Sequence, residues 1–210
     1  MSQPVESSPQ IMLEAHSTRD RVALVVSKYF SPLFAVLASN LIAALHVPEG
    51  FAAGAKWVLI TMCIQIIPVV ILYEIRLAQG RLSDPEMSHR QERNEAFLLG
   101  GISMIVAVTI LSVYNAPASV LALAASFLLI ATLCGIVNLW WKISMHASAI
   151  AAVAAIATLQ SRSLGAVFWC IVVAVAWSRL HTRNHTLGQV IAGTLLATTV
   201  VYGVYSYIVV

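Results

Sequence analysis

The chain of 210 residues is 60% hydrophobic and only 10% charged, with a formal net charge of +3. A soluble domain usually carries about 25% charged residues, so this composition excludes a soluble globular protein and indicates an integral membrane protein. The positive residues gather in a few short loops. This pattern is typical of membrane topology or of an anionic ligand, and we expect no nucleic-acid partner.

Residues 1–20 are polar and lack signal-peptide features, so we expect a flexible tail there. We expect residues 21–210 to form a single transmembrane helical domain. A membrane span needs about 20 apolar residues. The predicted fold is all-α, a polytopic membrane helical bundle of six to seven transmembrane helices. The expected helices cover 22–46, 56–78, 96–114, 118–139, 144–160, 164–179 and 188–208. Pro32 and Pro68 are expected inside spans, where neighbouring helices compensate for them.

Seven spans place the tail and the loops 79–95, 140–143 and 180–187 on one side of the membrane. Most lysines and arginines near the helix ends fall on this side, and the positive-inside rule then assigns it to the cytoplasm. We therefore expect a multi-pass protein of a bacterial or archaeal cell membrane, with its active face in the cytoplasm.

The polar segments on this side carry several cations that the topology brings to one membrane face. They are Arg81, Arg90, Arg93, Lys142, Arg179 and Arg183, together with the histidines His146 and His185. The planar guanidinium group of arginine can donate two parallel hydrogen bonds to phosphate oxygens. Of two histidines, one can attack phosphorus while the other protonates the leaving oxygen. Helix starts at 144 and 188 add backbone N–H donors for an anion. The cluster predicts a site for a phosphate monoester.

Two motifs in this cluster resemble a known family. Ser178-Arg179-x5-His185 resembles the third motif, S-R-x5-H-x3-D, of the type-2 phosphatidic acid phosphatase superfamily. Ser144-Met145-His146 resembles the second motif, P-S-G-H, and precedes the third by one helical hairpin, as in that family. The resemblance covers roughly residues 76–208, and it implies a phosphatidic acid phosphatase type-2-like core there.

The resemblance implies a role for each matching residue. His185 is the expected nucleophile and His146 the general acid, while Arg179 and Ser144 bind the phosphate. The family's chemistry requires no metal and no other cofactor. The family's last aspartate falls on Gln189, which is expected to orient His185 by accepting a hydrogen bond from the ring without a full negative charge.

The first family motif, K-x6-R-P, has no literal counterpart. Arg90 and Arg93 are the nearest candidates and are expected to bind phosphate, although acidic neighbours could pair with them. A predicted helical hairpin at 96–139 lies between these arginines and the second motif, which departs from the family's usual six spans. Candidate rim residues are Arg81, Lys142, His181 and Arg183. Trp140 and Trp141 beside Lys142 are also typical of a membrane-interface belt.

Together these features predict an integral membrane lipid phosphatase. Its substrate is expected to be a phosphate monoester or diphosphate on a lipid, such as a polyprenyl phosphate or phosphatidic acid, hydrolysed through a phosphohistidine. Two alternatives stay open: a phosphoryl or headgroup transferase on the same core, and a non-catalytic membrane protein that binds anionic lipid. The catalytic functions need both histidines, whereas the binding function needs mainly the arginines.

Overall fold

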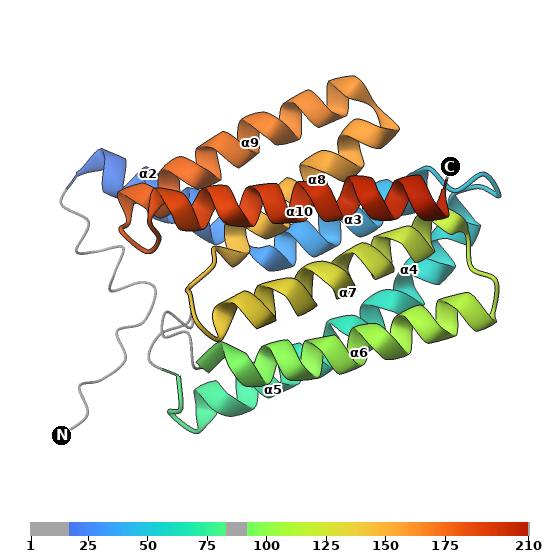
Figure 1. Cartoon of the computed structure of the whole chain (residues 1–210), viewed down its shortest axis with the longest axis horizontal. Helices are drawn as coiled ribbons and strands as arrows, with labels where there is room; N and C mark the ends of the chain where they lie inside the picture. Colours follow the sequence, from blue (N-terminus) through green and yellow to red (C-terminus); the bar gives the residue numbers. More distant parts are fainter. Residues whose placement is uncertain (1–16, 83–91, 210) are drawn as a thin grey trace.

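The computed structural model describes residues 17–82 and 92–209, and within these ranges the chain is helical, with no strand (Figure 1). The all-helical prediction is confirmed. The helices of the described residues are α2 Thr18–Tyr29, α3 Pro32–Leu45, α4 Phe51–Gln65, α5 Ile67–Ala78, α6 Arg93–Val113, α7 Ala118–Asn138, α8 Met145–Gln160, α9 Arg162–His181 and α10 Leu187–Ile208.

The helix ends separate into two groups along the long axis of the bundle. The start of α2, the end of α5, the start of α6 and the α7–α8 and α9–α10 connections lie at the left in Figure 1, and we call this group the polar end. The α3–α4, α6–α7 and α8–α9 connections lie at the right, as does the end of α10. This is the grouping of loops that the predicted topology requires.

Five of the described helical stretches are long and apolar enough to cross a membrane, which is compatible with a multi-pass membrane protein. They are Phe51–Ala78, Asn94–Val113, Ala118–Asn138, Arg162–His181 and Leu187–Ile208. A sixth span results if α2 and α3, which meet at 50°, are counted together. Helix α8 has 16 residues and is too short, because its length is about 24 Å and the hydrocarbon core is about 30 Å thick. The described residues therefore hold five or six candidate spans, where six to seven were predicted.

Two prolines mark helix breaks that the sequence prediction did not contain. The predicted helix 22–46 is two helices, because Pro32 occupies the first turn of α3 and the Ser31 side chain caps that turn by accepting the Phe34 N–H at 3.4 Å. Proline lacks a backbone donor and suits a helix start better than an interior. Pro68 likewise lies in the first turn of α5, which begins at Ile67 after a break at Ile66 and has no side-chain cap.

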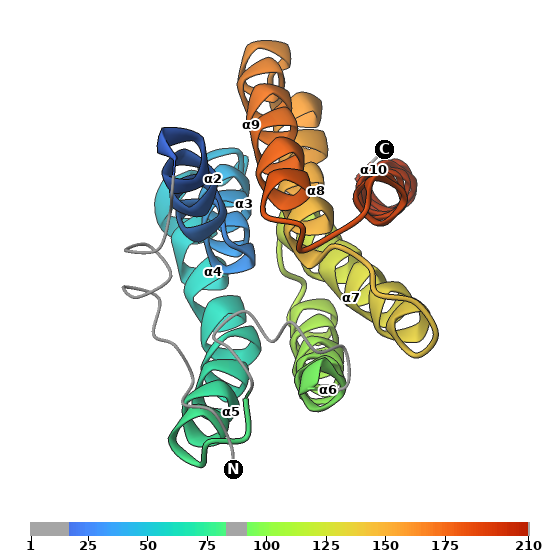
Figure 2. The same cartoon turned by 90° about the vertical axis from the view of Figure 1, so that its left-hand side faces the viewer.

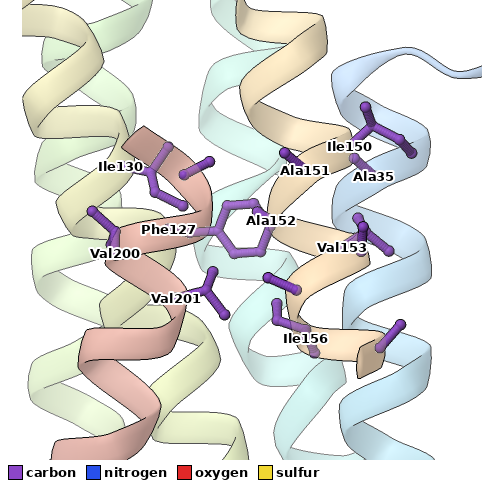
Figure 3. Packing of buried hydrophobic residues seen from close by; sticks show 14 of the residues in the cluster. Ala35, Phe127, Ile130, Ile150, Ala151, Ala152, Val153, Ile156, Val200 and Val201 are labelled. Atoms are coloured by element: carbon purple, nitrogen blue, oxygen red, sulfur yellow. The ribbon is translucent and has the colours of Figure 1, made fainter. Parts of the chain in front are cut away.

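The alanine-rich helix α8 lies in the centre of the bundle, in contact with α3, α9 and α10. Its side chains from Ile150 to Ala157 are completely buried. Figure 3 shows Val153 and Ile156 of α8 among side chains of neighbouring helices such as Phe127 and Val201. A helix that is apolar all round belongs in the interior, and small side chains let its neighbours approach closely.

The close approach of α8 and α9 gives a test of this packing. A Cβ atom added to Gly165 in α9 would lie 2.7 Å from the Cα of Thr158 in α8, a distance that real Cβ atoms do not adopt. The Thr158 hydroxyl also accepts a hydrogen bond from Trp169 at 3.1 Å, so its side chain is not free to turn away. We expect Gly165→Ala to destabilise the protein by about 1–3 kcal/mol, because the helices must separate.

The measurement is the thermal unfolding midpoint in detergent, with Gly203→Ala in α10 as the matched control. Apart from the backbone of its own helix and its chain neighbours, no described atom lies within 4 Å of a Cβ at Gly203. That substitution should leave the midpoint unchanged or raise it slightly, since alanine is the better helix former. Equal midpoints for the two variants would contradict the close packing of α8 on α9.

Candidate active site

The connection between α9 and α10 folds back so that His185 lies against the end of α9. Arg183 takes a left-handed backbone conformation, with φ of 55°. The His185 backbone N–H donates to the Arg179 carbonyl oxygen at 3.2 Å. His185 and Arg179 are both buried, with 6% and 2% of their surface exposed. The eight-residue motif from Ser178 to His185 is thus one closed turn that brings its arginine and its histidine together.

The first turn of α10 defines which nitrogen of His185 carries the proton. Thr186 and Gln189 form a capping box, in which the Thr186 hydroxyl accepts the Gln189 N–H at 3.4 Å and Gln189 Oε1 accepts the Thr186 N–H at 3.2 Å. A backbone N–H can only donate, so the Gln189 atom facing it must be the oxygen. The same oxygen lies 3.0 Å from His185 Nδ1. Nδ1 is therefore the protonated nitrogen, and the neutral ring has its lone pair on Nε2.

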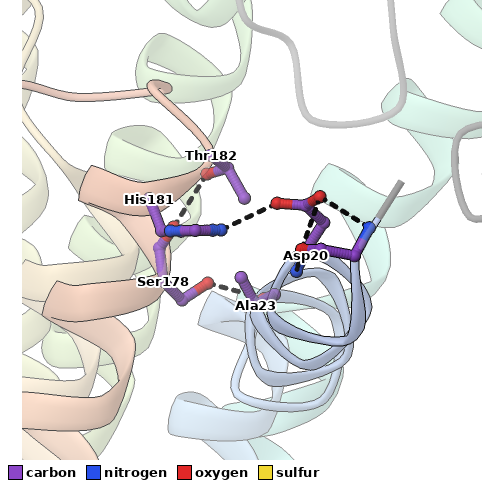
Figure 4. A network of polar contacts seen from close by, with 6 residues as sticks. Asp20, Ala23, Ser178, His181 and Thr182 are labelled. Atoms are coloured by element: carbon purple, nitrogen blue, oxygen red, sulfur yellow. Dashed lines mark hydrogen bonds and ion pairs between the residues drawn. The ribbon is translucent and has the colours of Figure 1, made fainter. Parts of the chain in front are cut away.

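Helix α2 packs against the end of α9 through three polar contacts. The Ser178 hydroxyl donates to the Ala23 carbonyl oxygen at 2.7 Å, and His181 Nε2 lies 2.8 Å from Asp20 Oδ1 (Figure 4). Arg179 Nη1 donates to the Ser27 hydroxyl. The Ser27 hydroxyl thus gives this almost completely buried guanidinium a hydrogen-bonded partner, and a buried charge is costly unless it is hydrogen-bonded.

The sequence prediction missed the part that α2 plays here. Residues 1–20 were expected to be a tail, but Ser17 and Asp20 form a capping box and the helix begins at Thr18. A serine followed three residues later by an acidic residue before an apolar run is a signal for such a helix start. His181, a candidate rim residue, stacks on Trp177 with ring centroids 5.2 Å apart and also contacts Asp20. It therefore anchors α2.

The second motif lies at the start of α8. Ser144 is completely buried and caps the helix, because its hydroxyl accepts the Ala147 N–H at 3.4 Å. His146, in the first turn, is half-buried. Helix α10 approaches this start at Gly193, where an added Cβ would lie 2.9 Å from the Ser144 carbonyl oxygen. The second motif thus lies on a helix that contacts both α9, whose end carries Ser178 and Arg179, and α10, which begins two residues after His185.

The remaining predicted site residues are exposed, half-buried or outside the described part of the chain. Arg90 lies outside the described residues, and of Arg93 only the backbone, at the start of α6, is described. Lys142 is half-buried in the α7–α8 connection. Arg183 is exposed beside the α9–α10 turn. Arg81 is exposed three residues after the end of α5, and α5 and α9 lie at opposite edges of the bundle (Figure 2).

Within the described ranges, no group of three or more histidine, cysteine or acidic side chains is placed to hold a metal ion. Comparisons with family models, curated proteins and solved structures found no match to this chain. The fold and the site therefore define a class in coarse terms: an all-helical protein with the spans of a multi-pass membrane protein and a buried arginine–histidine turn at its polar end.

Proposed function

We propose that this protein is an integral membrane lipid phosphatase in which His185 is the nucleophile. The observation that carries the proposal is the hydrogen bond from His185 Nδ1 to Gln189 Oε1 at 3.0 Å. It holds the ring in the tautomer that attack on phosphorus requires, with the lone pair on Nε2. The substrate is a phosphate monoester or diphosphate on a lipid.

The chemistry proceeds in two balanced steps. His185 Nε2 attacks the terminal phosphorus, the bond from this phosphorus to the leaving oxygen breaks, and protonated His146 gives its proton to that oxygen. A monoester thereby releases a lipid alcohol, and a diphosphate releases a lipid monophosphate. Water then attacks the phosphohistidine. The phosphorus–nitrogen bond breaks, neutral His146 accepts the proton of the water, and inorganic phosphate leaves.

The charges at the site favour these steps. The guanidinium of Arg179 stabilises the negative charge that grows on the phosphoryl oxygens. The N-termini of α8 and α10 add partial positive charge at the same end of the bundle. Attack by Nε2 makes the imidazole ring positive, and Gln189 Oε1 then accepts a hydrogen bond from a cationic donor. An amide oxygen stabilises that cation less than a carboxylate does.

This difference predicts the effect of Gln189→Glu. Glutamate has the shape of glutamine and keeps the capping box with Thr186, but it places a full negative charge beside His185 Nδ1. We expect phosphate release from lipid phosphates to rise about tenfold, because stabilising the cationic ring by about one pKa unit lowers the barrier by the equivalent of a factor of about ten. Purified protein, tested against a panel of lipid phosphates with and without EDTA, gives the measurement.

Gln189→Leu is the matched control, because it removes the acceptor and should lower the rate. The pH profile provides a second readout: the added carboxylate should move the limb that reports His185 to higher pH. Folded wild-type and Gln189→Glu proteins that both release no phosphate from any lipid would overturn the proposal. That result would favour a protein that binds anionic lipid without catalysis.

A further inference from the structure

Helix α2 covers the side chain of Arg179, the residue to which the proposed function assigns phosphate binding. The Ser27 hydroxyl of α2 accepts a hydrogen bond from Arg179 Nη1. Both residues are buried, Ser27 with 1% and Arg179 with 2% of its surface exposed. A phosphoryl oxygen binds arginine through the same N–H groups of the guanidinium. In this position α2 therefore engages a donor that a substrate needs.

The start of α2 is held against α9 by polar contacts. Asp20 Oδ1 lies 2.8 Å from His181 Nε2, and the Ser178 hydroxyl donates to the Ala23 carbonyl oxygen at 2.7 Å (Figure 4). Of the twelve residues of α2, Ala23 and Ser27 are the two that are buried. Hydrophobic stabilisation scales with the apolar area removed from water, and these two small side chains remove little. The start of α2 can therefore leave α9 without opening the apolar core.

The other end of α2 has the features of a hinge. Phe30 leaves the helical conformation, with φ of −92° and ψ of 46°, and Pro32 then begins α3 at an angle of 50° to α2. The Phe30 ring packs edge-on against Phe34 of α3, with ring centroids 5.2 Å apart, and both rings pack against the core. This end of the helix is thus held by apolar packing. A helix held in this way at one end and by polar contacts at the other can pivot about its apolar end.

We propose that α2 is an autoinhibitory latch on the phosphate-binding arginine. While α2 is docked, Ser27 holds the guanidinium of Arg179. When the start of α2 pivots away from α9 about Phe30, the guanidinium turns to the phosphoryl oxygens of the substrate. The equilibrium between docked and open α2 sets the fraction of the protein that is competent to bind a lipid phosphate. This inference rests on the proposed function, because the latch inhibits only if Arg179 binds phosphate.

A cross-link between α2 and α9 tests whether the docked state is inactive. Asp20→Cys and His181→Cys are combined with Cys63→Ser and Cys170→Ser, which remove the two exposed native cysteines. A bifunctional methanethiosulfonate reagent joins the two new thiols, and dithiothreitol releases it. We expect cross-linking to slow phosphate release from lipid phosphates by at least about tenfold, and dithiothreitol to restore the rate. The two single-cysteine variants, treated in the same way, are the controls and should keep their rates.

A second measurement detects the opening of α2 without any reference to activity. Ser178→Cys and Ser27→Cys each place a thiol beneath the docked helix, at positions that are at most 1% exposed, and the rate of labelling by a thiol reagent reports opening. Asp20→Asn should raise both rates about two- to fivefold, the contribution of a partly exposed ion pair such as that with His181. Asparagine still offers an oxygen to the Ser17 N–H, so the start of α2 stays capped.

Glu49→Gln is the matched control for the removal of a negative charge. Glu49 is exposed in the α3–α4 connection at the opposite end of the bundle, and its substitution should leave both labelling rates unchanged. Equal labelling with and without Asp20→Asn would contradict the latch. An unchanged rate of phosphate release after cross-linking would remove the inhibitory role and leave the phosphatase proposal standing. No phosphate release even before cross-linking would overturn the phosphatase proposal and the inhibition with it, whatever the labelling shows.

Discussion

Replacing His185 with glutamine is expected to lower phosphate release from lipid phosphates by at least about 10³-fold, the size of effect seen when an enzyme loses its nucleophile. Glutamine has no lone pair that can attack phosphorus at the position of Nε2. It is polar and of similar size, so the buried turn at the end of α9 should stay folded. The measurement is single-turnover phosphate release together with trapping of a radiolabelled phospho-enzyme, which should form in wild type and be absent from the variant.

His46→Gln is the matched control for this experiment. His46 follows α3 at the opposite end of the bundle, is exposed, and its Nδ1 lies 2.8 Å from the Ile42 carbonyl oxygen. Its substitution should change neither the rate nor the phospho-enzyme. Wild-type phosphate release in His185→Gln would remove His185 from the mechanism, whatever the activity of the protein proves to be.

Arg179→Lys is expected to reduce kcat/KM for lipid phosphates by about 10²–10³-fold. Lysine keeps the positive charge but not the planar fork that fits two phosphoryl oxygens, so both ground-state and transition-state contacts are weakened. Lysine also lacks Nη1, which donates to the Ser27 hydroxyl. The substitution therefore loosens the packing of α2 as well, and this adds to the loss of activity.

Two further variants separate these causes. Ser27→Ala removes the same hydrogen bond from the other side and leaves the guanidinium in place, so it should lower the thermal midpoint about as much as Arg179→Lys while keeping most of the activity. Arg162→Lys, at the opposite end of α9, controls for the change of residue type. Equal loss of activity in Ser27→Ala and Arg179→Lys would mean that Arg179 serves the packing of α2.

The His185 and Arg179 variants together discriminate between the two classes of function. A phosphatase requires both side chains for turnover. A protein that only binds anionic lipid would lose lipid binding in Arg179→Lys and keep it in His185→Gln. Lipid binding measured on the same protein preparations gives this comparison directly.

Local features of the fold could be predicted because they depend on neighbours in the sequence. Apolar runs bounded by charges predicted the helices from α6 to α10 with small errors at their ends. The hydrogen bond between His185 and Gln189 was expected from the family resemblance, and it is a local contact between residues four apart. The same reasoning explains the capping boxes at Ser17 and Thr186, which involve only the first turn of a helix.

The contacts of α2 with α9 depend instead on residues far apart in the chain. Ser27 and Arg179 are 152 positions apart, and neither local spacing nor composition pairs them. Helix α8 is as apolar as its neighbours, yet it is the helix that is buried on all sides. In a membrane protein the side chains that face lipid and those that face protein are both apolar, so hydropathy separates them poorly. Close packing at small residues such as Gly165 and Gly193 brings α9 and α10 against α8, and the sequence pattern alone does not show which helices pair in this way.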